Sequence, residues 1–553
     1  MNSIAFFNAQ KKRKRNPLVE FQLKNENTLI FKLKNVTGKT PFDLFEKVGI
    51  RQHQIMASQL QAVVDMCDKH GYEVVPFPDQ VQLALDKSTS FPFDETFKAS
   101  HLYKCMFDYQ KEGVEKVVRV FDGRALIGDE MGLGKTLQAI SLADYYDAKR
   151  LIIVCPAYLR YTWKHELEKW IPGIESTVIL TGRDKIEGVP FPLIFSYEQA
   201  AAKAKELKKM KPDMIVCDES HYLKSHKTKR SKALAPLVKS VKRALLLSGT
   251  PALNRPIELF SQLHMLYPKI FPKYRQFAER YADGKMSPMG FYDASGISNK
   301  YELLWIARKT ALIRRVKRDV LTQLPKKIRS EIYVNLSRKD VKPLTPLFGK
   351  WKDLNARIPG MVPCSDEIKK AAFERKCVIT ELFRKTSEAK VEVVKKVVAG
   401  MVEQDLKFIV FCYHKDLMDE VQSVCPSNMR IDGDTPMKNR QKYVEAFQRG
   451  ETQVAVLSML AASTGITLTA ASIVLFAELY YVPGVILQAE DRLHRIGQAS
   501  AVDVRFIIAK GSLDEHLFKM LHYKLATLDT ALDGRSDREL KGEKQIEWGG
   551  LDV

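Results

Sequence analysis

The sequence predicts an α/β protein made of two doubly wound lobes with helical insertions, preceded by a small α+β domain. Three observations predict this fold class. Apolar segments of strand length alternate with helical segments in two separate parts of the chain, which is typical of parallel, doubly wound sheets. A charged stretch of helical period separates these two parts. Before the first of them, apolar and polar residues alternate on both sides of a polar turn, which is a hairpin pattern.

The small domain is expected at residues 17–85, after a basic N-terminal tail at residues 1–16. Its hairpin covers residues 17–34, and helices are expected at about 41–48 and 57–69. The apolar positions along the two arms of the hairpin are Val19, Phe21 and Leu23, then Leu29, Phe31 and Leu33.

The first lobe is expected at residues 101–268. It opens with an amphipathic helix whose apolar face carries Val114, Val117, Val118 and Phe121. Five strand-like segments follow, separated by helical ones: "RALI", "RLIIVCP", "PLIFSY", "DMIVCD" and "RALLLSG".

Residues 269–390 are expected to form helical insertions and a linker, in which "RKTALIRRVKRDVLTQLPKK" is the most basic piece. The second lobe is expected at residues 391–545, where strand-like segments return: "KFIVFCYH", "MRIDGD", "QVAVLSM", "ASIVLFAEL" and "VDVRFIIA". Within it, residues 470–487 are long and apolar enough to resemble a membrane span. Glu478 in the middle and the break at Pro483 favour a buried strand followed by a helix, so no membrane segment is expected.

The charge balance predicts a polyanionic partner. Of the 553 residues, 88 are lysine or arginine and 66 are acidic, which leaves a net charge of +22. This surplus favours nucleic acid, although an acidic membrane surface would fit as well. The eight cysteines form no C-x-x-C pair, so neither a zinc site nor a disulfide framework is expected, and a reducing compartment is favoured.

Five consecutive basic residues, Lys11 to Arg15, allow three interpretations: a nuclear import signal, a DNA-binding arm, or a disordered tail. We favour nuclear import, and so a nuclear location, for a host that has a nucleus. In a prokaryotic or viral source the protein would act in the cytoplasm or nucleoid.

The stretch "GDEMGLGKT", Gly128 to Thr136, follows a predicted strand and opens a predicted helix. A glycine-rich turn in this context aims backbone N–H groups at phosphate oxygens. Lys135 would reach the β- and γ-phosphates, and Thr136 would ligate magnesium. The strict phosphate-loop pattern fails because Asp129 stands at the first glycine position, so a glycine-rich turn without a nucleotide is the alternative.

Two further motifs lie at predicted strand ends. "DMIVCDESH" ends in a DEAH-like box made of Asp218, Glu219, Ser220 and His221. An aspartate there can hold magnesium while the glutamate polarises the attacking water, although a single aspartate can also simply cap a strand. "LLLSGTP" places Ser248, Gly249 and Thr250 where small hydroxyl groups could sense the γ-phosphate and couple hydrolysis to motion.

"QAEDRLHRIGQ", Gln488 to Gln498, carries Arg492 and Arg495 three residues apart on a predicted helix. If the second lobe faces the first, both guanidinium groups can close onto a bound nucleotide, where an arginine finger stabilises transition-state charge. The alternative is an exposed polar helix face.

These motifs, in this order, resemble those of superfamily-two helicases of the Swi/Snf-related type, over roughly residues 105 to 525. The "HRIGQ" ending separates this group from DEAD-box RNA helicases. One branch is especially similar, the annealing helicases with a HARP domain (the SMARCAL-like group). The strings that carry this similarity are "AELYYVPGVILQAEDRLHRIGQ", "LLLSGTPALNRPIELF", "IRRVKRDVLTQLPKK" and "RIDGDTP". The N-terminal hairpin-and-helix domain is similar to a HARP domain.

The resemblance implies two RecA-like lobes that bind ATP and Mg²⁺, with Gln110 on the adenine base. By the family's pattern Arg495 would be the finger and Arg492 its supporting contact. The expected catalytic residues are Lys135, Asp218, Glu219, Arg492 and Arg495, and the expected metal ligands are Thr136 and Asp218. The expected nucleotide contacts are Gln110, Asp129, Glu130, Met131, Gly132, Leu133, Gly134, Lys135, Thr136 and Gly465.

The function expected from this resemblance is that of an ATP-dependent DNA translocase or annealing helicase, which rewinds or remodels stalled forks and bubbles in DNA repair and replication-fork maintenance. Alternatives are a nucleosome-remodelling ATPase and an ATP-gated DNA clamp that does not rewind strands. The expected partners of this monomeric motor are double-stranded and forked DNA. A single-strand-binding protein is a further candidate, although no docking helix for one is recognised in the sequence. Phosphate contacts are expected from loops after strands, among them "PAYLRYTWK", Arg255, "YHKD" and "AASTGITL".

Overall fold

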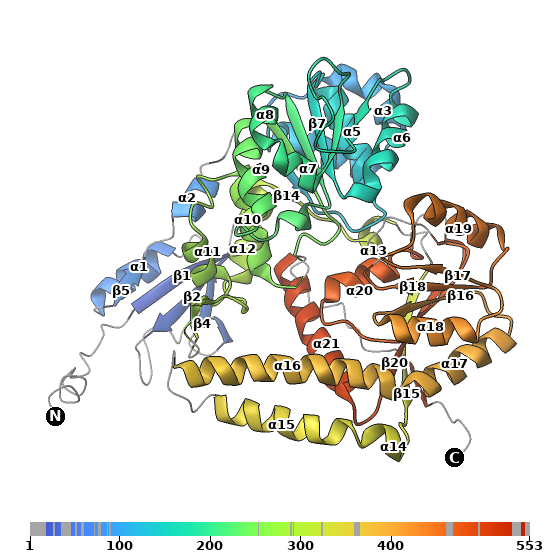
Figure 1. Cartoon of the computed structure of the whole chain (residues 1–553). Coiled ribbons are helices and arrows are strands. Elements are labelled where there is room, and N and C mark those ends of the chain that lie inside the picture. The colour runs from blue at the N-terminus through green and yellow to red at the C-terminus, as the bar shows by residue number, and fades with distance from the viewer. Residues whose placement is uncertain are drawn as a thin grey trace.

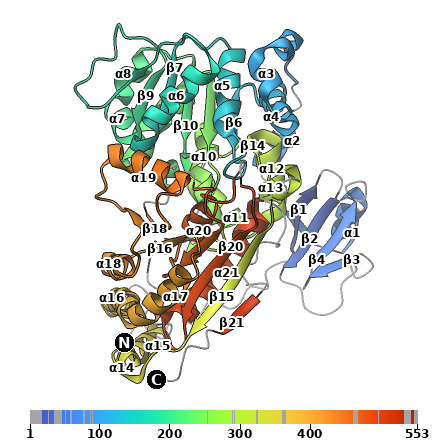
Figure 2. The ribbon, with the colours of Figure 1, turned by 90° about the vertical axis from the view of Figure 1, so that its right-hand side faces the viewer.

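The computed structural model consists of a small N-terminal domain and two larger lobes (Figures 1 and 2). It describes residues 18–25, 28–34, 46–49, 52–56, 60–70, 72–75, 79–85, 87, 90–252, 254–287, 290, 292–321, 325–358, 365–460, 468–495, 498–532 and 544–547. The basic run Lys11–Arg15 and Gly465 lie outside these residues.

The small domain is a five-stranded sheet in the order β3-β4-β2-β1-β5, with helix α1. Its elements are β1 (Leu18–Asn25), β2 (Thr28–Lys34), β3 (Glu46–Gly49), β4 (Gln52–Met56), α1 (Leu60–Lys69) and β5 (Glu73–Val75). The predicted hairpin is confirmed, because β1 and β2 are antiparallel with Val19 opposite Leu33 and Phe21 opposite Phe31. The second expected helix is confirmed as α1.

The helix expected at about 41–48 is wrong where the structure describes it, because Glu46–Gly49 is a strand. This short segment satisfies its backbone hydrogen bonds by pairing with β4, with Glu46 opposite Gln54. A segment of four residues is too short for a stable helical turn of its own, so tertiary pairing decides its state.

Lobe 1 contains a seven-stranded sheet in the order β14-β6-β11-β10-β7-β9-β8. Its strands are β6 (Arg124–Ile127), β7 (Leu151–Cys155), β8 (Thr177–Val178), β9 (Leu193–Ser196), β10 (Met214–Asp218), β11 (Arg243–Leu247) and β14 (Leu312–Ile313). All neighbouring strands that pair are parallel. The five strands predicted for this lobe are confirmed. Their apolar runs follow from burial on both faces of the sheet.

The principal helices of lobe 1 are α3 (His101–Cys105), α4 (Asp108–Arg119), α5 (Lys135–Tyr145), α6 (Arg160–Trp170), α7 (Tyr197–Ala202), α8 (Ala204–Lys209), α9 (Lys229–Ser240), α10 (Leu259–Leu266), α11 (Tyr274–Tyr281) and α12 (Lys300–Thr310). The apolar face expected for the first of the long helices is buried in α4, at Val114, Val117 and Val118. Helix α2 (Asp79–Leu85) belongs by sequence to the small domain, but its Val81 and Ala84 are buried in the core of lobe 1.

Lobe 2 repeats the architecture with a seven-stranded sheet in the order β17-β18-β16-β19-β20-β15-β21. Its strands are β15 (Lys327–Val334), β16 (Phe408–Cys412), β17 (Asn428–Ile431), β18 (Val454–Ser458), β19 (Ile473–Phe476), β20 (Val502–Ala509) and β21 (Lys544–Glu547). Its helices are α17 (Val391–Glu403), α18 (Lys415–Ser423), α19 (Met437–Arg449), α20 (Pro483–Glu490) and α21 (Leu513–Leu532). The five strands predicted for this lobe are confirmed.

The segment expected to form helical insertions, residues 269–390, contains helices α11 to α16, but it also contains strands. It contains the long helices α15 (Leu344–Arg357) and α16 (Asp366–Ala389), which lie side by side (Figure 1), and the short helices α13 (Lys317–Val320) and α14 (Arg338–Val341). It also contains the small hairpin of β12 (Lys285–Met286) and β13 (Tyr292–Asp293). Strands β14 and β15 come from the same segment but complete the sheets of lobe 1 and lobe 2, so this connection joins the two lobes through both sheets.

The apolar run at residues 470–487 forms β19 and the start of α20, as predicted. None of the helices in the described part of the chain is long and apolar enough to cross a membrane.

Candidate active site

The glycine-rich loop joins β6 to α5 at the carboxyl edge of the lobe 1 sheet. Gly132 and Gly134 have φ values of +85° and +70°, a region that favours glycine. Gly134 is the N-cap of α5, so the loop leads directly into a helix N-terminus that can receive phosphate. A Cβ atom on Gly134 would lie 2.2 Å from Nε2 of Gln110, so a side chain cannot replace this glycine without moving its neighbour.

Asp129 and Glu130, two expected nucleotide contacts, hold the loop in shape. The buried carboxylate of Asp129 accepts hydrogen bonds from Nε2 of Gln138 and from the backbone N–H of Arg315, both at 3.0 Å. The carboxylate of Glu130 accepts the backbone N–H of Lys317 at 2.7 Å. The acid at the first glycine position therefore has a structural role that a glycine could not fill.

Lys135 lies inside the curl of the loop. Its Nζ donates hydrogen bonds to the carbonyl oxygens of Asp129 at 2.9 Å and Glu130 at 3.3 Å. Burial lowers the pKa of Lys135, while the nearby carboxylates of Glu219, Asp129 and Asp218 act in the opposite direction. Thr136 follows in the first turn of α5 and is half-buried.

The two acids of the DEAH-like box stand at the end of β10. Oδ2 of Asp218 accepts a hydrogen bond from the indole N–H of Trp163 at 2.9 Å. Burial, and then the neighbouring charge of Glu219, raise the pKa of Asp218 above its ordinary value. Glu219 has a φ of +50°, which turns the chain sharply after the strand.

Glu219 is held in its ionised form by its surroundings. Burial alone would raise its pKa, but His221, whose Nδ1 lies 3.2 Å from Oε2, lowers it together with Lys135 and Arg492. The net pKa lies below the ordinary value, so the carboxylate is charged at neutral pH. A charged carboxylate beside the half-buried Lys135 can orient and polarise a water molecule.

Ser248, Gly249 and Thr250 connect the acids to lobe 2. Oγ of Ser248 lies 3.3 Å from Nδ1 of His221 and accepts the backbone N–H of Thr250 at 3.2 Å. Oγ1 of Thr250 accepts a hydrogen bond from Nε2 of Gln488, a lobe 2 residue, at 2.9 Å. Gly249 is packed so closely on Met131 that a Cβ atom there would lie 2.2 Å from Cγ of Met131.

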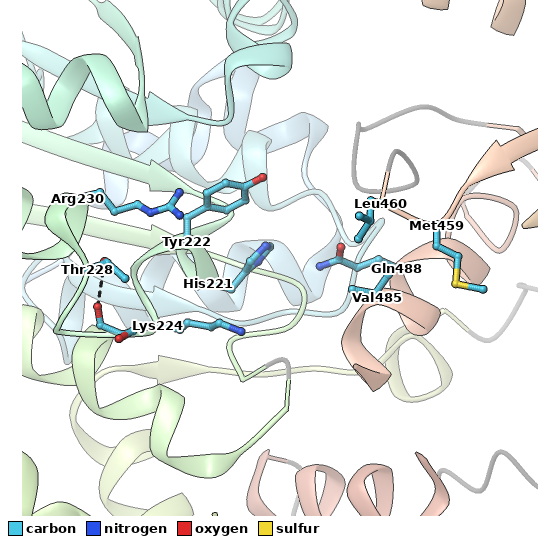
Figure 3. Close-up of a pocket in the computed structure, with 10 residues that line it drawn as sticks. His221, Tyr222, Lys224, Thr228, Arg230, Met459, Leu460, Val485 and Gln488 are labelled. Carbon is cyan, nitrogen blue, oxygen red and sulfur yellow. Dashed lines mark hydrogen bonds between the residues drawn. The ribbon is translucent and has the colours of Figure 1, made fainter. Parts of the chain in front are cut away.

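A cavity of about 280 Å³ lies between the two lobes, next to this connection. Figure 3 shows His221 and Tyr222 of lobe 1 on one side and Gln488 and Leu460 of lobe 2 on the other. The remaining lining residues are Lys224, Ser225, Thr228, Arg230, Met459 and Val485.

Arg492 and Arg495 lie in the turn after α20, which ends at Glu490, so their predicted helical placement is wrong. The turn is held by hydrogen bonds from the N–H of Leu493 to the carbonyl of Glu490 and from the N–H of Arg492 to the carbonyl of Ala489. An exposed face is also excluded, because Arg492 is 1% exposed. The tight turn still directs both side chains toward lobe 1.

Both arginines face the lobe 1 half of the site. Burial lowers the pKa of Arg492, while Tyr158 and Glu219 of lobe 1 act against that shift. Burial and the charge of Arg492 lower the pKa of Arg495. A Cβ atom on Gly132 would lie 3.4 Å from Cγ of Arg495, which places this side chain directly against the glycine-rich loop.

Gln110 also lies against the loop. Its Nε2 donates to the carbonyl oxygen of Leu133 at 3.0 Å, and its Oε1 accepts the N–H of Phe107 at 2.9 Å. The structure thus brings together every expected site residue that it describes, and their catalytic roles stay predictions.

Sequence reasoning missed three basic residues that follow β14. Arg314 donates to the carbonyl oxygens of Gly128 at 2.6 Å and Gly249 at 3.0 Å. Arg315 and Lys317 hold the glycine-rich loop from behind through their backbone N–H groups. In the sequence they belong to the most basic piece of residues 269–390, and such a charge run is as consistent with a solvated face as with a DNA-binding groove. The signal available was the apolar "ALI" before "RRVK", which marks a buried strand that ends in charges.

Two family models match the chain, the SNF2-related domain over residues 109–354 and the helicase conserved C-terminal domain over residues 389–497. The chain belongs to the SNF2-related family. This membership and the two parallel sheets confirm the resemblance and the predicted fold class of two RecA-like lobes. Nucleotide use follows from the family.

Three relatives illustrate the similarity. The SWI/SNF-related matrix-associated actin-dependent regulator of chromatin subfamily A-like protein 1 of Xenopus tropicalis is 38% identical over 447 residues, 78% of this chain and 45% of that protein. DNA annealing helicase and endonuclease ZRANB3 of Bos taurus is 39% identical over 453 residues, 78% of this chain and 41% of that protein. The Caenorhabditis elegans homolog of the first protein is 38% identical over 478 residues, 82% of this chain and 66% of that protein.

The chain spans less than half the length of the first two relatives. Among solved structures, the SWI2/SNF2 ATPase core of Sulfolobus solfataricus in complex with double-stranded DNA aligns over 78% of this chain and 93% of that chain. The sequence identity is 23% and the TM-score is 0.37, a likeness too low to support an inference.

Proposed function

We propose that this protein is a DNA-dependent ATPase that moves along double-stranded DNA and rewinds branched DNA such as forks and bubbles. One observation carries the ATPase part of the proposal: Arg492 and Arg495 of lobe 2 lie against the glycine-rich loop and Glu219 of lobe 1. Because both lobes contribute residues, the site is complete only when the lobes meet. Nucleotide hydrolysis is therefore linked to lobe movement.

The residues fit Mg²⁺ and a nucleoside triphosphate. Thr136 and Asp218, both half-buried, would hold Mg²⁺, which neutralises charge on the β- and γ-phosphates. Lys135 would exchange its two carbonyl partners for phosphate oxygens, and the ionised Glu219 would orient the attacking water. Arg495 would stabilise the charge that develops on the γ-phosphoryl group, with Arg492 beside it.

DNA as the partner is supported by the net charge of +22 and by the relatives, one of which is named a DNA annealing helicase. If each lobe holds the phosphate backbone, closing on ATP and opening after hydrolysis moves the protein stepwise without reading bases. A nucleus is the location that fits this function in a eukaryotic host. A chromatin-directed ATPase is the second candidate, because another relative is named a regulator of chromatin.

The N-terminal domain is proposed to act as a HARP-like module that favours branched DNA. It lies against lobe 1, where β1 contacts α12. The chain that leaves the domain continues along lobe 1, because Nζ of Lys87 donates to the carbonyl oxygen of Thr310 at 2.9 Å. Nε2 of Gln80 also donates to the hydroxyl of Tyr281 at 3.3 Å. Through these contacts a domain that binds a fork can reach the helix that leads into β14.

The test compares ATP hydrolysis without nucleic acid and with single-stranded DNA, duplex, fork, RNA and nucleosomes. Duplex and fork DNA should stimulate hydrolysis far more than RNA, and a melted fork should be rewound. Lys135→Ala should abolish hydrolysis and keep DNA binding, since it removes only the phosphate-binding cation. Removing residues 1–75, which leaves α2 in the lobe 1 core, should keep basal hydrolysis and reduce stimulation by forks.

Each result decides a part of the proposal. Equal stimulation by RNA and duplex DNA would contradict a DNA motor, and hydrolysis that responds only to nucleosomes would favour the chromatin candidate. DNA binding should also weaken steeply with salt, with a log–log slope of about −0.9 for each phosphate neutralised. Affinity that does not change with salt would remove the electrostatic basis of the proposal.

A further inference from the structure

Lys317 contacts both halves of the candidate active site. Its backbone N–H donates to the carboxylate of Glu130 in the glycine-rich loop at 2.7 Å. Its Nζ lies 3.0 Å from Oδ1 of Asp491, in the arginine-bearing turn of lobe 2, and also donates to the carbonyl oxygen of His494 in that turn. One residue therefore joins the phosphate-binding loop to the turn that carries the arginines.

The ion pair between Lys317 and Asp491 is buried. The side chains are 4% and 5% exposed, respectively. Burial alone would raise the pKa of Asp491, but Lys317 and the nearby Lys327 hold it below the ordinary value. A buried charge without a partner is strongly destabilising. Lys317 and Asp491 therefore strongly stabilise the arrangement of the lobes in which their side chains are paired.

Asp491 in turn holds Arg495. The carbonyl oxygen of Asp491 accepts a hydrogen bond from Nε of Arg495 at 2.9 Å, and Arg492 is the next residue in the chain. Moving Asp491 would therefore move both guanidinium groups away from the loop. The other polar contact described above between the lobes, Gln488 to Thr250, is neutral and does not involve this turn.

Lys317 lies at the start of α13, on the lobe 1 side of the segment between the lobes, and Asp491 lies in lobe 2. Lys317 follows β14, which pairs with the loop-bearing strand β6, whereas Asp491 follows α20 of lobe 2. Because Lys317 is hydrogen-bonded to Glu130 of lobe 1, its pair with Asp491 forms when the turn of lobe 2 closes on the glycine-rich loop.

We propose that Lys317 and Asp491 are positioning residues that form a closure latch, which sets Arg495 against the glycine-rich loop when the lobes close. The proposal rests on the proposed ATPase function and adds to it the element that couples lobe closure to the arginine finger. Lys317 packs beside Gly132 and Asp491 holds Arg495, so the contribution of the pair is to the geometry of Arg495 against the loop in the closed state.

The variants that test the latch are Lys317→Met, Asp491→Asn and the two combined. The double variant leaves neither Lys317 nor Asp491 as an unpaired buried charge. It can therefore be measured even if a single variant does not fold. The matched control is Arg318→Met, which removes a positive charge from the next residue of α13, whose side chain is 48% exposed.

Three readouts separate positioning from a general loss of structure. They are kcat and KM for ATP with saturating fork DNA, affinity for a fluorescent ATP analogue, and energy transfer between dyes on Cys105 and Cys377. Both cysteines are exposed, one in α3 of lobe 1 and the other in α16, which leads into lobe 2. Cys364 is replaced by serine so that it takes no dye.

We expect kcat to fall about 100-fold in both single variants, because a displacement of about 1 Å at a reacting group has an effect of this size. Affinity for the analogue should stay within about twofold, and the nucleotide-induced change in energy transfer should shrink. The kcat of the double variant should be no lower than that of the less active single variant, because both substitutions break the same interaction. Arg318→Met should match the wild type.

Wild-type kcat and energy transfer in the double variant would overturn the latch, as would single-variant losses that multiply in the double variant. Failure of the proposed function has a different signature. In that case wild-type protein shows no DNA-stimulated hydrolysis, while energy transfer, which needs no hydrolysis, still reports whether Lys317 and Asp491 hold the lobes together.

Discussion

The two lobes have similar sheets but unlike carboxyl edges. In lobe 1, Asp218 ends β10, Glu219 follows it, and both lie near Lys135 of the glycine-rich loop. In lobe 2, Glu478 follows β19 and is 2% exposed, but it accepts the backbone N–H groups of Tyr413 at 2.7 Å and His414 at 2.9 Å. The acid of lobe 2 is thus satisfied by its own lobe, whereas the acids of lobe 1 face a cation that a nucleotide can share.

The contrast shows that an acid at the end of a buried strand does not make a catalytic site. A phosphate-binding loop must lie beside it, and lobe 1 has such a loop between β6 and α5. Lobe 2 contributes guanidinium groups from the turn after α20. The two lobes therefore have similar sheets but different proposed roles: lobe 1 binds the phosphates, and lobe 2 stabilises the charge that develops on them.

The largest expected effect comes from the lobe 2 side. Arg495→Ala should lower kcat by about 10³–10⁵-fold, with the affinity for ATP nearly unchanged, because the interaction forms mainly in the transition state. Arg495→Lys should restore little, since lysine lacks the planar fork of donors. Steady-state kinetics with saturating fork DNA measures both variants, and rewinding should fail in both. Full rewinding by Arg495→Ala would show that lobe 2 supplies no finger.

A smaller effect separates the two acids. Glu219→Gln should lower kcat by about 10²–10³-fold and keep nucleotide binding, because the amide cannot polarise water. Glu478→Gln should leave kcat within a few-fold, since this carboxylate only supports its own lobe. The comparison needs single-turnover hydrolysis and nucleotide affinity for both variants. A decrease in kcat for Glu478→Gln as large as that for Glu219→Gln would contradict the different roles of the two acids.

The smallest effect is on stability and depends on pH. Buried Glu490 is paired with Lys327 and Arg329, at 2.8 Å and 2.7 Å. Burial alone would raise its pKa, but these two cations lower it to about 2. Because the folded pKa is below the unfolded one, the pair stabilises the protein above about pH 4.5, and this stability is lost as the pH falls toward 2.

Glu490→Gln should therefore lower the free energy of unfolding by about 3 kcal/mol at pH 7. The difference in the free energy of unfolding between the variant and the wild type should become smaller below pH 4.5. Urea unfolding at a series of pH values measures it, and a difference that stays constant down to pH 3 would show that the Glu490 charge is not what stabilises this contact.

The sequence by itself determined the local elements and the lobe 1 half of the site. Strands such as β7 and β16 are apolar throughout because both faces of a parallel sheet are buried, and this leaves a direct signal. The glycine-rich loop and the DEAH-like box are each one contiguous stretch, so the sequence alone places Lys135 at a helix start and Asp218 and Glu219 at a strand end. The hairpin of the small domain was readable for the same reason, since its register depends on neighbouring residues.

Only the tertiary structure decided which distant residues meet. Residues 46–49 form a strand because they pair with β4, although their own sequence predicted a helix. The two arginines lie in a turn and not in the predicted helix, and the burial of Arg492 depends on the packing of lobe 1 against lobe 2, which no local pattern determines. Lys317 and Asp491 are 174 residues apart, and each resembles an ordinary surface charge in the sequence. Their pairing depends on the packing of two complete lobes, because burial and Coulomb attraction act on distance in space and leave no periodic signal along the chain.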